Sequence, residues 1–138
     1  MNKSFAILGM GRYGQELAKS LYDNGADVLI ADDDSELINQ LAPNATYAVC
    51  TDLAEPDNLA DLGLSNMDVV VVCMSRHVEA SVMCAMYAKE SGVPLVVAKA
   101  SSERMGKLLK KVGADKITYV EEEAARRAAN HLVSDNLL

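Results

Sequence analysis

Aromatic residues are scarce in this sequence. It contains no tryptophan, one phenylalanine and five tyrosines, so aliphatic side chains and methionine must supply most of the hydrophobic core. Proline is also rare, and neither a low-complexity tract nor an internal repeat is present. Hydrophobic residues still make up 50% of the 138 residues, which excludes a disordered chain and favours one domain.

Basic residues are outnumbered by acidic ones. The 13 lysines and arginines face 20 aspartates and glutamates, which gives a formal net charge of −7 at pH 7. A phosphate backbone or an anionic bilayer surface attracts a basic protein face, so we expect no nucleic-acid partner and no direct binding to such a bilayer. No apolar run approaches the length of a membrane span, so direct membrane insertion is not expected either.

Cysteine and histidine are too few for the common catalytic or metal-binding patterns. Cys50, Cys73 and Cys84 are an odd number without metal-ligand spacing, and we interpret them as buried, reduced thiols of a cytoplasmic protein. The histidines, His77 and His131, have no partner placed by spacing to orient them, and no Gly-x-Ser-x-Gly motif is present. The sequence therefore offers no acid–base pair that would indicate an enzyme.

A glycine-rich turn is present in a specific setting. The apolar residues 5–8 lead into G-x-G-x-x-G at Gly9, Gly11 and Gly14, and a helical pattern follows. Such glycines permit a tight turn, a close approach of phosphate to the backbone, and close packing of the helix, while the helix start attracts an anion. The motif predicts a nucleotide site, although a fold that has lost its ligand would look the same. The remaining loop residues are predicted to line this site: Met10, Arg12 and Tyr13.

An acidic residue follows the second predicted strand at the position expected for ribose binding. Asp32 ends that strand, and a carboxylate there accepts hydrogen bonds from both ribose hydroxyls of an adenosine. The neighbouring Asp33 and Asp34 would repel a 2′-phosphate, which disfavours NADP. The alternative is that these acids are only solvated, and either Asp34 or Ser35 caps the next helix.

Short apolar runs alternate with helical patterns to the end of the chain. We predict strands at residues 4–9, 27–31, 46–50, 68–73, 94–99 and 116–120, and helices at 12–24, 35–42, 56–62, 77–91, 103–112 and 121–133. This rhythm predicts an α/β Rossmann-like fold with a doubly wound, parallel six-stranded sheet in the order 3-2-1-4-5-6, formed by a single domain. No second domain that would hold a substrate is apparent.

Ligands of such sheets bind at the carboxyl ends of the strands, which selects further candidates. Asp52 is either an adenine contact or a loop acid, Arg12 is a phosphate contact or a solvated residue, and Lys99 is a phosphate contact or half of a salt bridge. The predicted nucleotide-binding set at these strand ends is completed by Asp33, Thr51, Cys73, Met74 and Ser75.

The sequence resembles the RCK (or KTN) domains, which regulate potassium channels and Trk/Ktr potassium-uptake systems. Residues 3–14 (KSFAILGMGRYG) resemble the opening of these domains, and an arginine inside the glycine loop is typical of the Ktr-type gating subunit. Further similarities are Asp32, the Thr51-Asp52 pair, and residues 113–116 (GADK) before the sixth strand. Glu121 lies where many members carry Pro-Glu, although here Val120 replaces the proline.

The resemblance implies a cytoplasmic regulator, not an enzyme, that binds ATP/ADP or NAD(H) and gates a membrane potassium transporter. It implies a homodimer, of the kind that often assembles further into octameric rings in this family, held at the inner face of the membrane by its transporter. It also implies that Glu121 helps to hold Mg²⁺ or Na⁺, or forms a subunit contact. Residues 1–138 would be the N-terminal nucleotide-binding domain, without the C-terminal subdomain that members usually have. The alternatives are an NAD-dependent oxidoreductase fragment lacking its substrate domain and an interaction domain without a ligand.

Overall fold

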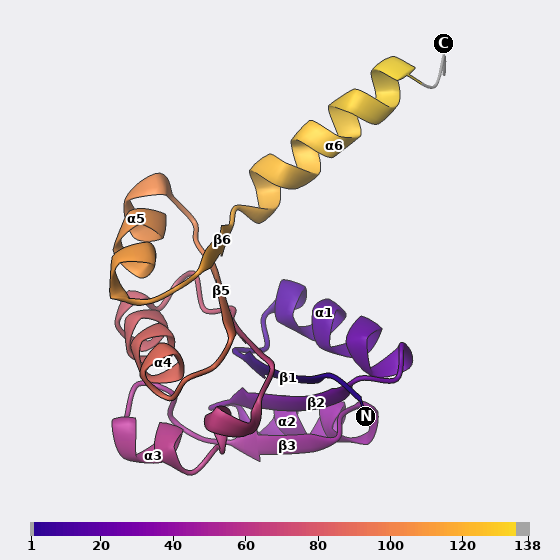
Figure 1. Ribbon diagram of the computed structural model, residues 1–138. Coiled ribbons are helices and arrows are strands. Elements are labelled where there is room, and N and C mark those ends of the chain that lie inside the picture. The colour runs from indigo at the N-terminus through magenta and orange to yellow at the C-terminus, as the bar shows by residue number, and fades with distance from the viewer. Residues whose placement is uncertain (1, 135–138) are drawn as a thin grey trace.

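The computed structural model describes residues 2–134 and contains a six-stranded, all-parallel sheet in the order β3-β2-β1-β4-β5-β6. This confirms the predicted doubly wound order (Figure 1). The strands are β1 (Ser4–Leu8), β2 (Asp27–Asp32), β3 (Tyr47–Cys50), β4 (Val69–Val72), β5 (Leu95–Lys99) and β6 (Lys116–Thr118). The α-helices are α1 (Arg12–Asp23), α2 (Ser35–Leu41), α3 (Pro56–Ala60), α4 (Val78–Glu90), α5 (Glu103–Val112) and α6 (Val120–Ser134), with short 3-10 turns at Ala42–Asn44 and Leu64–Asn66.

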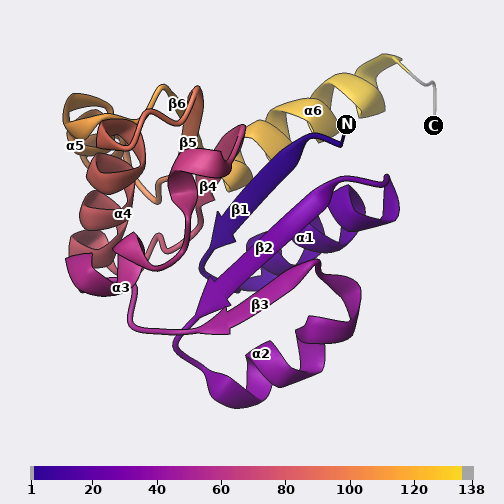
Figure 2. The same cartoon turned by 60° about the horizontal axis from the view of Figure 1, so that its bottom comes forward.

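Helices cover both faces of the sheet, as the apolar central strands require. Every residue of β4 is buried, which is expected of a parallel strand with helices on both sides. Side chains of α1 and α2, including Leu17 and Leu37, pack with one face of the sheet. Side chains of α3, α4 and α5, including Leu59 and Leu109, pack with the other. Figure 2 shows α3, α4 and α5 grouped together, apart from α1 and α2.

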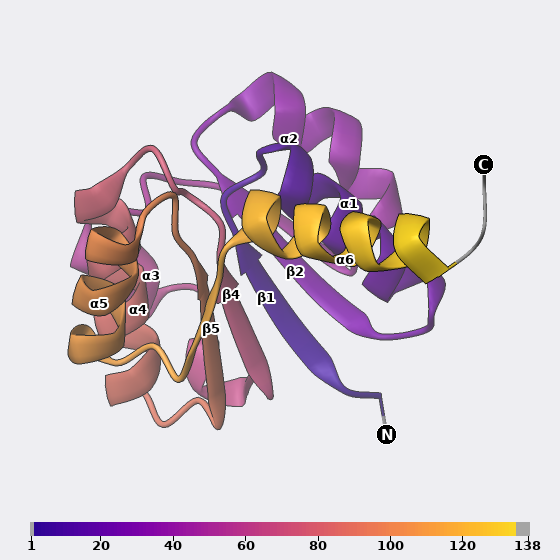
Figure 3. The ribbon, with the colours of Figure 1, turned by 90° about the horizontal axis from the view of Figure 1, so that it is seen from above.

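The last helix departs from the predicted pattern. The predicted strand at 116–120 is too long, because β6 ends at Thr118 and α6 begins at Val120. No residue of α6 is buried, and Leu132 and Val133 are 62% and 83% exposed. Figure 1 shows α6 extending away from the rest of the molecule, and in the view from above it passes in front of α1 and β1 (Figure 3).

The cysteine prediction is correct for two of the three thiols. Cys73 and Cys84 are buried, and burial raises the pKa of each to about 12, so neither is a thiolate at neutral pH. Cys50 is exposed instead, because β3 is an edge strand and Cys50 is its last residue. Its Sγ donates to the carbonyl of Asp33 at 3.6 Å.

Candidate functional site

Two of the three motif glycines are required by the fold itself. Gly9 has a φ of +102°, and a Cβ there would lie 2.5 Å from Met74 Cγ and 2.9 Å from the Cys73 carbonyl oxygen. A Cβ on Gly14 would collide with the carbonyl oxygen of Gly9. The tight turn and the close packing of α1 predicted from the motif are therefore both present.

Gly11 differs from the other two glycines. No atom within the described chain outside its immediate neighbours lies within 4 Å of a Cβ built there, and its φ of −69° suits any residue. Gly11 is also the N-cap of α1, where it has no side chain to bond the first amides of the helix. The packing of the domain does not explain a glycine at this position, whereas a ligand lying against the loop would.

Asp32 connects the end of β2 to the glycine loop. One carboxylate oxygen accepts from the Met10 amide at 2.7 Å, and the other accepts from the Asp34 amide at 3.0 Å. Asp34 in turn caps α2, because its carboxylate accepts from the Leu37 amide at 3.1 Å. The choice between Asp34 and Ser35 as the helix cap is thus decided for Asp34.

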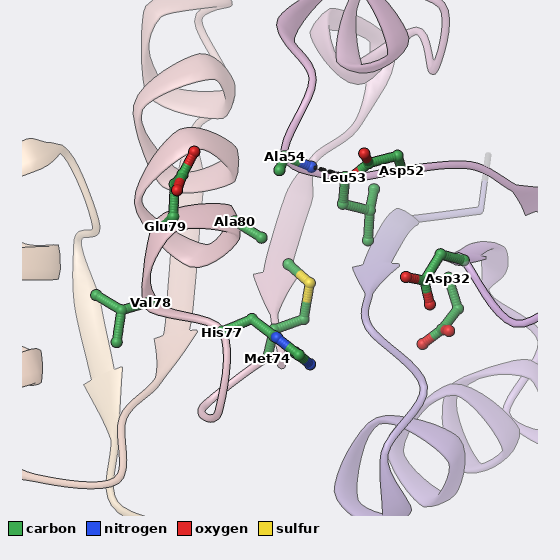
Figure 4. Close-up of a pocket in the computed structure, with 10 residues that line it drawn as sticks. Asp32, Asp52, Leu53, Ala54, Met74, His77, Val78, Glu79 and Ala80 are labelled. Carbon is green, nitrogen blue, oxygen red and sulfur yellow. Dashed lines mark hydrogen bonds between the residues drawn. The ribbon is translucent and has the colours of Figure 1, made fainter.

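A cavity of about 420 Å³ opens beside Asp32, between the loop after β3 and the start of α4 (Figure 4). Asp32 lies on one side, and Met74 and His77 project from the loop after β4 on the other. Asp52 lines this cavity, and its carboxylate accepts from the Ala54 amide at 3.0 Å, which shapes the loop. The other lining residues are Asp33, Leu53, Ala54, Val78, Glu79 and Ala80.

A second cavity, of about 730 Å³, extends from the same aspartate over the glycine loop. Lys99 lies with its Nζ 5.9 Å from the centre of the Tyr13 ring, and Arg12 and Glu121 line the same space. Burial, and to a lesser extent the nearby Cys73 and Glu123, raises the pKa of Tyr13. The remaining lining residues are Gly9, Met10, Gly11, Asp32, Cys73, Met74, Ser75, Arg76, His77 and Val120.

The structure thus gathers most of the predicted residues around two cavities that share Asp32, Met74 and His77. Gly14 and Thr51 line neither cavity; the Thr51 amide donates to the Asp32 carbonyl at 2.9 Å.

Sequence reasoning left several lining residues out of the predicted site. Arg76 and His77 line the larger cavity, and Glu79 and Leu53 line the smaller one. The signal for them was available, because each follows closely on the carboxyl end of β3 or β4. The loop after β4 is held by Ser81, whose buried hydroxyl donates to the Met74 carbonyl at 2.8 Å.

The described part of the chain contains no ready-made metal site. Within residues 2–134, no group of three or more His, Cys, Asp and Glu side chains is placed to hold a metal ion. Glu121 would therefore need ligands from another molecule to hold a cation. Over the same residues, no helix has both the length and the apolar character needed to cross a bilayer.

Two curated proteins are similar to the chain over nearly its whole length. It is 37% identical to Ktr system potassium uptake protein C of Bacillus subtilis (strain 168) over 138 residues, which are all of this chain and 62% of that protein. It is 34% identical to Ktr system potassium uptake protein A of the same organism over 137 residues, 99% of this chain and 62% of that protein. The chain therefore spans less than two thirds of the length of these relatives.

Solved structures share the fold at low sequence identity. The TrkA-N domain of the inner membrane protein ybaL from Escherichia coli superimposes with a TM-score of 0.83 at 16% identity, covering 96% of this chain and 98% of that one. The GsuK channel bound to NAD superimposes at 0.72 with 14% identity (86% and 21% coverage), and GsuK bound to ADP at 0.70 with 14% identity (86% and 31%). The TrkA-N domain profile itself matches residues 5–120, so this chain belongs to the TrkA-N family.

Proposed function

We propose that residues 1–138 form a nucleotide-binding regulatory domain that controls a membrane potassium-uptake system from the cytoplasm. The observation that carries this proposal is the pair of cavities that meet at Asp32, one of them lined by the glycine loop. The identity of 37% to a Ktr system protein supports the connection to potassium uptake. The transporter subunit would hold the domain at the inner face of the membrane.

The adenosine of the ligand would span the junction of the two cavities. An ionised carboxylate has about four acceptor positions, and the Met10 and Asp34 amides use two of those of Asp32, which leaves room for two ribose hydroxyls. The adenine would then enter the smaller cavity, where Asp52 can accept from its exocyclic amine. The phosphates would lie over Gly11, against the first amides of α1.

The larger cavity suits the phosphate end of the ligand electrostatically. Arg12, Arg76 and Lys99 outnumber Asp32 and Glu121 around it, although the whole chain carries a net charge of −7. ATP, ADP and NAD(H) all place phosphate here, and the two GsuK structures contain NAD or ADP. A cation bound beside Glu121 would draw its other ligands mainly from these phosphates.

Regulation would follow from differential binding within an oligomer. Two nucleotides that share the adenosine but differ at the phosphate end bias a two-state assembly only if they contact its states differently. Exposed apolar residues on α4 (Val78, Met86) and α6 (Leu132, Val133) support a homodimer, or a ring of dimers, as that assembly. We propose regulation without chemical turnover, because the similar curated proteins are named as potassium uptake proteins and burial raises the pKa of the Cys73 and Cys84 thiols to about 12.

Titration calorimetry with ATP, ADP, AMP, NAD, NADH and NADP tests nucleotide binding directly. We expect saturable binding of the nucleotides whose adenosine ribose has a free 2′-hydroxyl. NADP should bind much more weakly, because its 2′-phosphate would meet Asp32 and Asp33. Failure of every adenine nucleotide to bind would favour an interaction domain without a ligand. Oxidation of NADH by any carbonyl compound would favour the oxidoreductase alternative.

Gating is tested by potassium uptake in cells that lack their own uptake systems and express the full-length protein with its transporter. We expect growth at low potassium with the native protein and its loss with a Gly11→Val variant, whose side chain would occupy the phosphate position. Equal growth with and without the regulator would contradict the proposed function.

A further inference from the structure

One face of α6 is turned toward the body of the domain without packing against it. Glu123, Arg126, Arg127 and Asn130 follow the i, i+3, i+4, i+7 spacing that places residues on one helix face. They line a cavity of about 490 Å³, which Lys116 and Thr118 of β6 and Tyr13 of α1 complete.

The orientation of α6 is the reverse of an ordinary packed helix. The opposite face carries Ala125, Ala128 and Leu132, and Leu132 is 62% exposed. A helix that served only to cover the sheet would turn this apolar face inward. Lys116, Arg126, Arg127 and Asn130 are exposed to solvent, so this polar, charged lining suits water or an ionic ligand.

The charges around this cavity do not balance. Lys116, Arg126 and Arg127 face a single acid, Glu123, in a chain whose net charge is −7. Over the described residues, the ion pairs Lys19–Asp23 and Lys89–Asp115 include none of these three cations. Their mutual repulsion is relieved when an anion lies between them.

We propose that this cavity is a second anion site, which binds a phosphate group of a small soluble molecule. Guanidinium groups bind phosphate oxygens in pairs, and Lys116 supplies a further charge. The Thr118 hydroxyl, the Asn130 amide and the Tyr13 hydroxyl are neutral donors on the same lining. Burial raises the pKa of Tyr13, so its hydroxyl keeps its proton and remains a donor at neutral pH. A lipid headgroup offers the same phosphate, but the acidic chain would be repelled by an anionic bilayer.

This site is separate from the larger cavity over the glycine loop, here called the nucleotide cavity, and adjoins it. The two cavities share only Tyr13. Val120 and Glu121, at the start of α6, line the larger cavity over the glycine loop, whereas Glu123, Arg126, Arg127 and Asn130, further along the helix, line the anion site.

Nuclear magnetic resonance with ¹⁵N-labelled protein tests the proposal, with pyrophosphate as the probe at constant ionic strength. The titration is run with and without saturating ADP, because pyrophosphate can also enter the nucleotide cavity. With ADP present, we expect saturable shifts of the Thr118, Arg127 and Asn130 amides. The double variant Arg126→Gln/Arg127→Gln should bind pyrophosphate about tenfold more weakly or worse. Arg104→Gln removes an exposed arginine of α5 that lines neither cavity and should bind like the native protein.

Three results would overturn the proposal. Shifts confined to residues 9–14 would place all pyrophosphate binding in the nucleotide cavity. Equally weakened pyrophosphate binding in Arg104→Gln would assign the effect to the overall charge of the protein and not to this site. Binding to phosphatidylglycerol vesicles that depends on Arg126 and Arg127, with no response to pyrophosphate, would make the ligand a lipid. Circular dichroism of the variants checks that α6 remains folded, and failure of ADP to bind would count against the nucleotide site alone.

Discussion

The carboxylate of Asp32 accepts a hydrogen bond from the backbone amide of Met10 at 2.7 Å, which joins the end of β2 to the turn after β1. The two residues are far apart in sequence, and the bond lies at the junction of the two cavities. Asp32 therefore has a structural role in orienting the glycine loop as well as its proposed role in ribose binding.

Replacing Asp32 by alanine should weaken every adenine nucleotide by about 1.5–3 kcal/mol, because charge-assisted hydrogen bonds to the ribose are lost. Calorimetry with ATP, ADP and AMP measures this effect. Asp27→Ala, at the exposed other end of β2, is the control and should leave affinity unchanged. Native affinity in Asp32→Ala would show that the ribose is held elsewhere.

Alanine at Gly11 and at Gly14 should have opposite effects. Gly11→Ala meets no packing clash in the domain, and its gain in chain entropy is opposed by the lower preference of alanine for the N-cap of α1, so the unfolding free energy should change by less than about 1 kcal/mol while nucleotide binding is lost or strongly reduced. Gly14→Ala forces a methyl group onto the Gly9 carbonyl and should destabilise the domain by about 1–3 kcal/mol. Urea denaturation and calorimetry of both variants separate the effects. Native nucleotide affinity in the Gly11→Ala variant would show that the phosphates do not lie against this loop.

Arg12→Ala should weaken ATP more than AMP, because Arg12 lines the cavity over the glycine loop and not the smaller cavity. We expect a loss of about 1.5–3 kcal/mol for ATP, the range for a hydrogen bond to a charged group. Competition binding of ATP and AMP gives the ratio, with Arg104→Ala as the control. Equal losses of binding free energy for ATP and AMP would show that Arg12 supports the fold and does not contact the phosphates.

Stability should depend on the charge of Asp115 in the acid range. Burial acts to raise its pKa, but hydrogen bonds from Lys89 and the Val96 amide, both at 2.8 Å, outweigh it, so the pKa lies below the ordinary 3.8. The pKa of Asp115 is lower in the folded state than in the unfolded state. The contribution of its charge to folding stability is therefore complete above the unfolded-state pKa and is lost as pH falls through the folded-state pKa.

Asp115→Asn should therefore destabilise the domain by about 1 kcal/mol at neutral pH, a value reduced by the partial exposure of the pair. Urea denaturation at a series of pH values measures the difference in unfolding free energy between Asp115→Asn and the native protein. This difference should shrink below pH 3.8. Asp61→Asn, at an exposed position after α3, is the control. A difference that stays constant into the acid range would assign the effect to packing instead of charge.

The chain should form at least a dimer at micromolar concentration, and Leu132→Glu should weaken it. The reason is that α6 presents Leu132 and Val133 to solvent, and a charged side chain there opposes burial by another copy. Sedimentation velocity with and without ATP and Mg²⁺ measures the assembly, and Asn39→Glu on the exposed side of α2 is the control. A monomer under both conditions would exclude a regulatory dimer for this chain.

Local sequence patterns determined much of the fold. The apolar run before Gly9, the all-valine β4 and the alternation of strands with helices predicted the parallel sheet and its order, because period and turn chemistry are short-range properties. The glycine motif and Asp32 likewise predicted where the cavities open, since parallel strands present their carboxyl ends at one edge.

Tertiary structure decided what depends on neighbours distant in the chain. The predicted strand order already placed β3 at the sheet edge, and the motif already gave Gly14 a packing role, but only the structure shows that Cys50 is exposed there and that Gly14 lines neither cavity. Arg76 and His77 joined the site because the loop after β4 lies across from Asp32. The sequence of α6 indicates its two faces, but only the packed structure turns the cationic face toward β6 and leaves the apolar face exposed, because burial depends on contacts that no local period encodes.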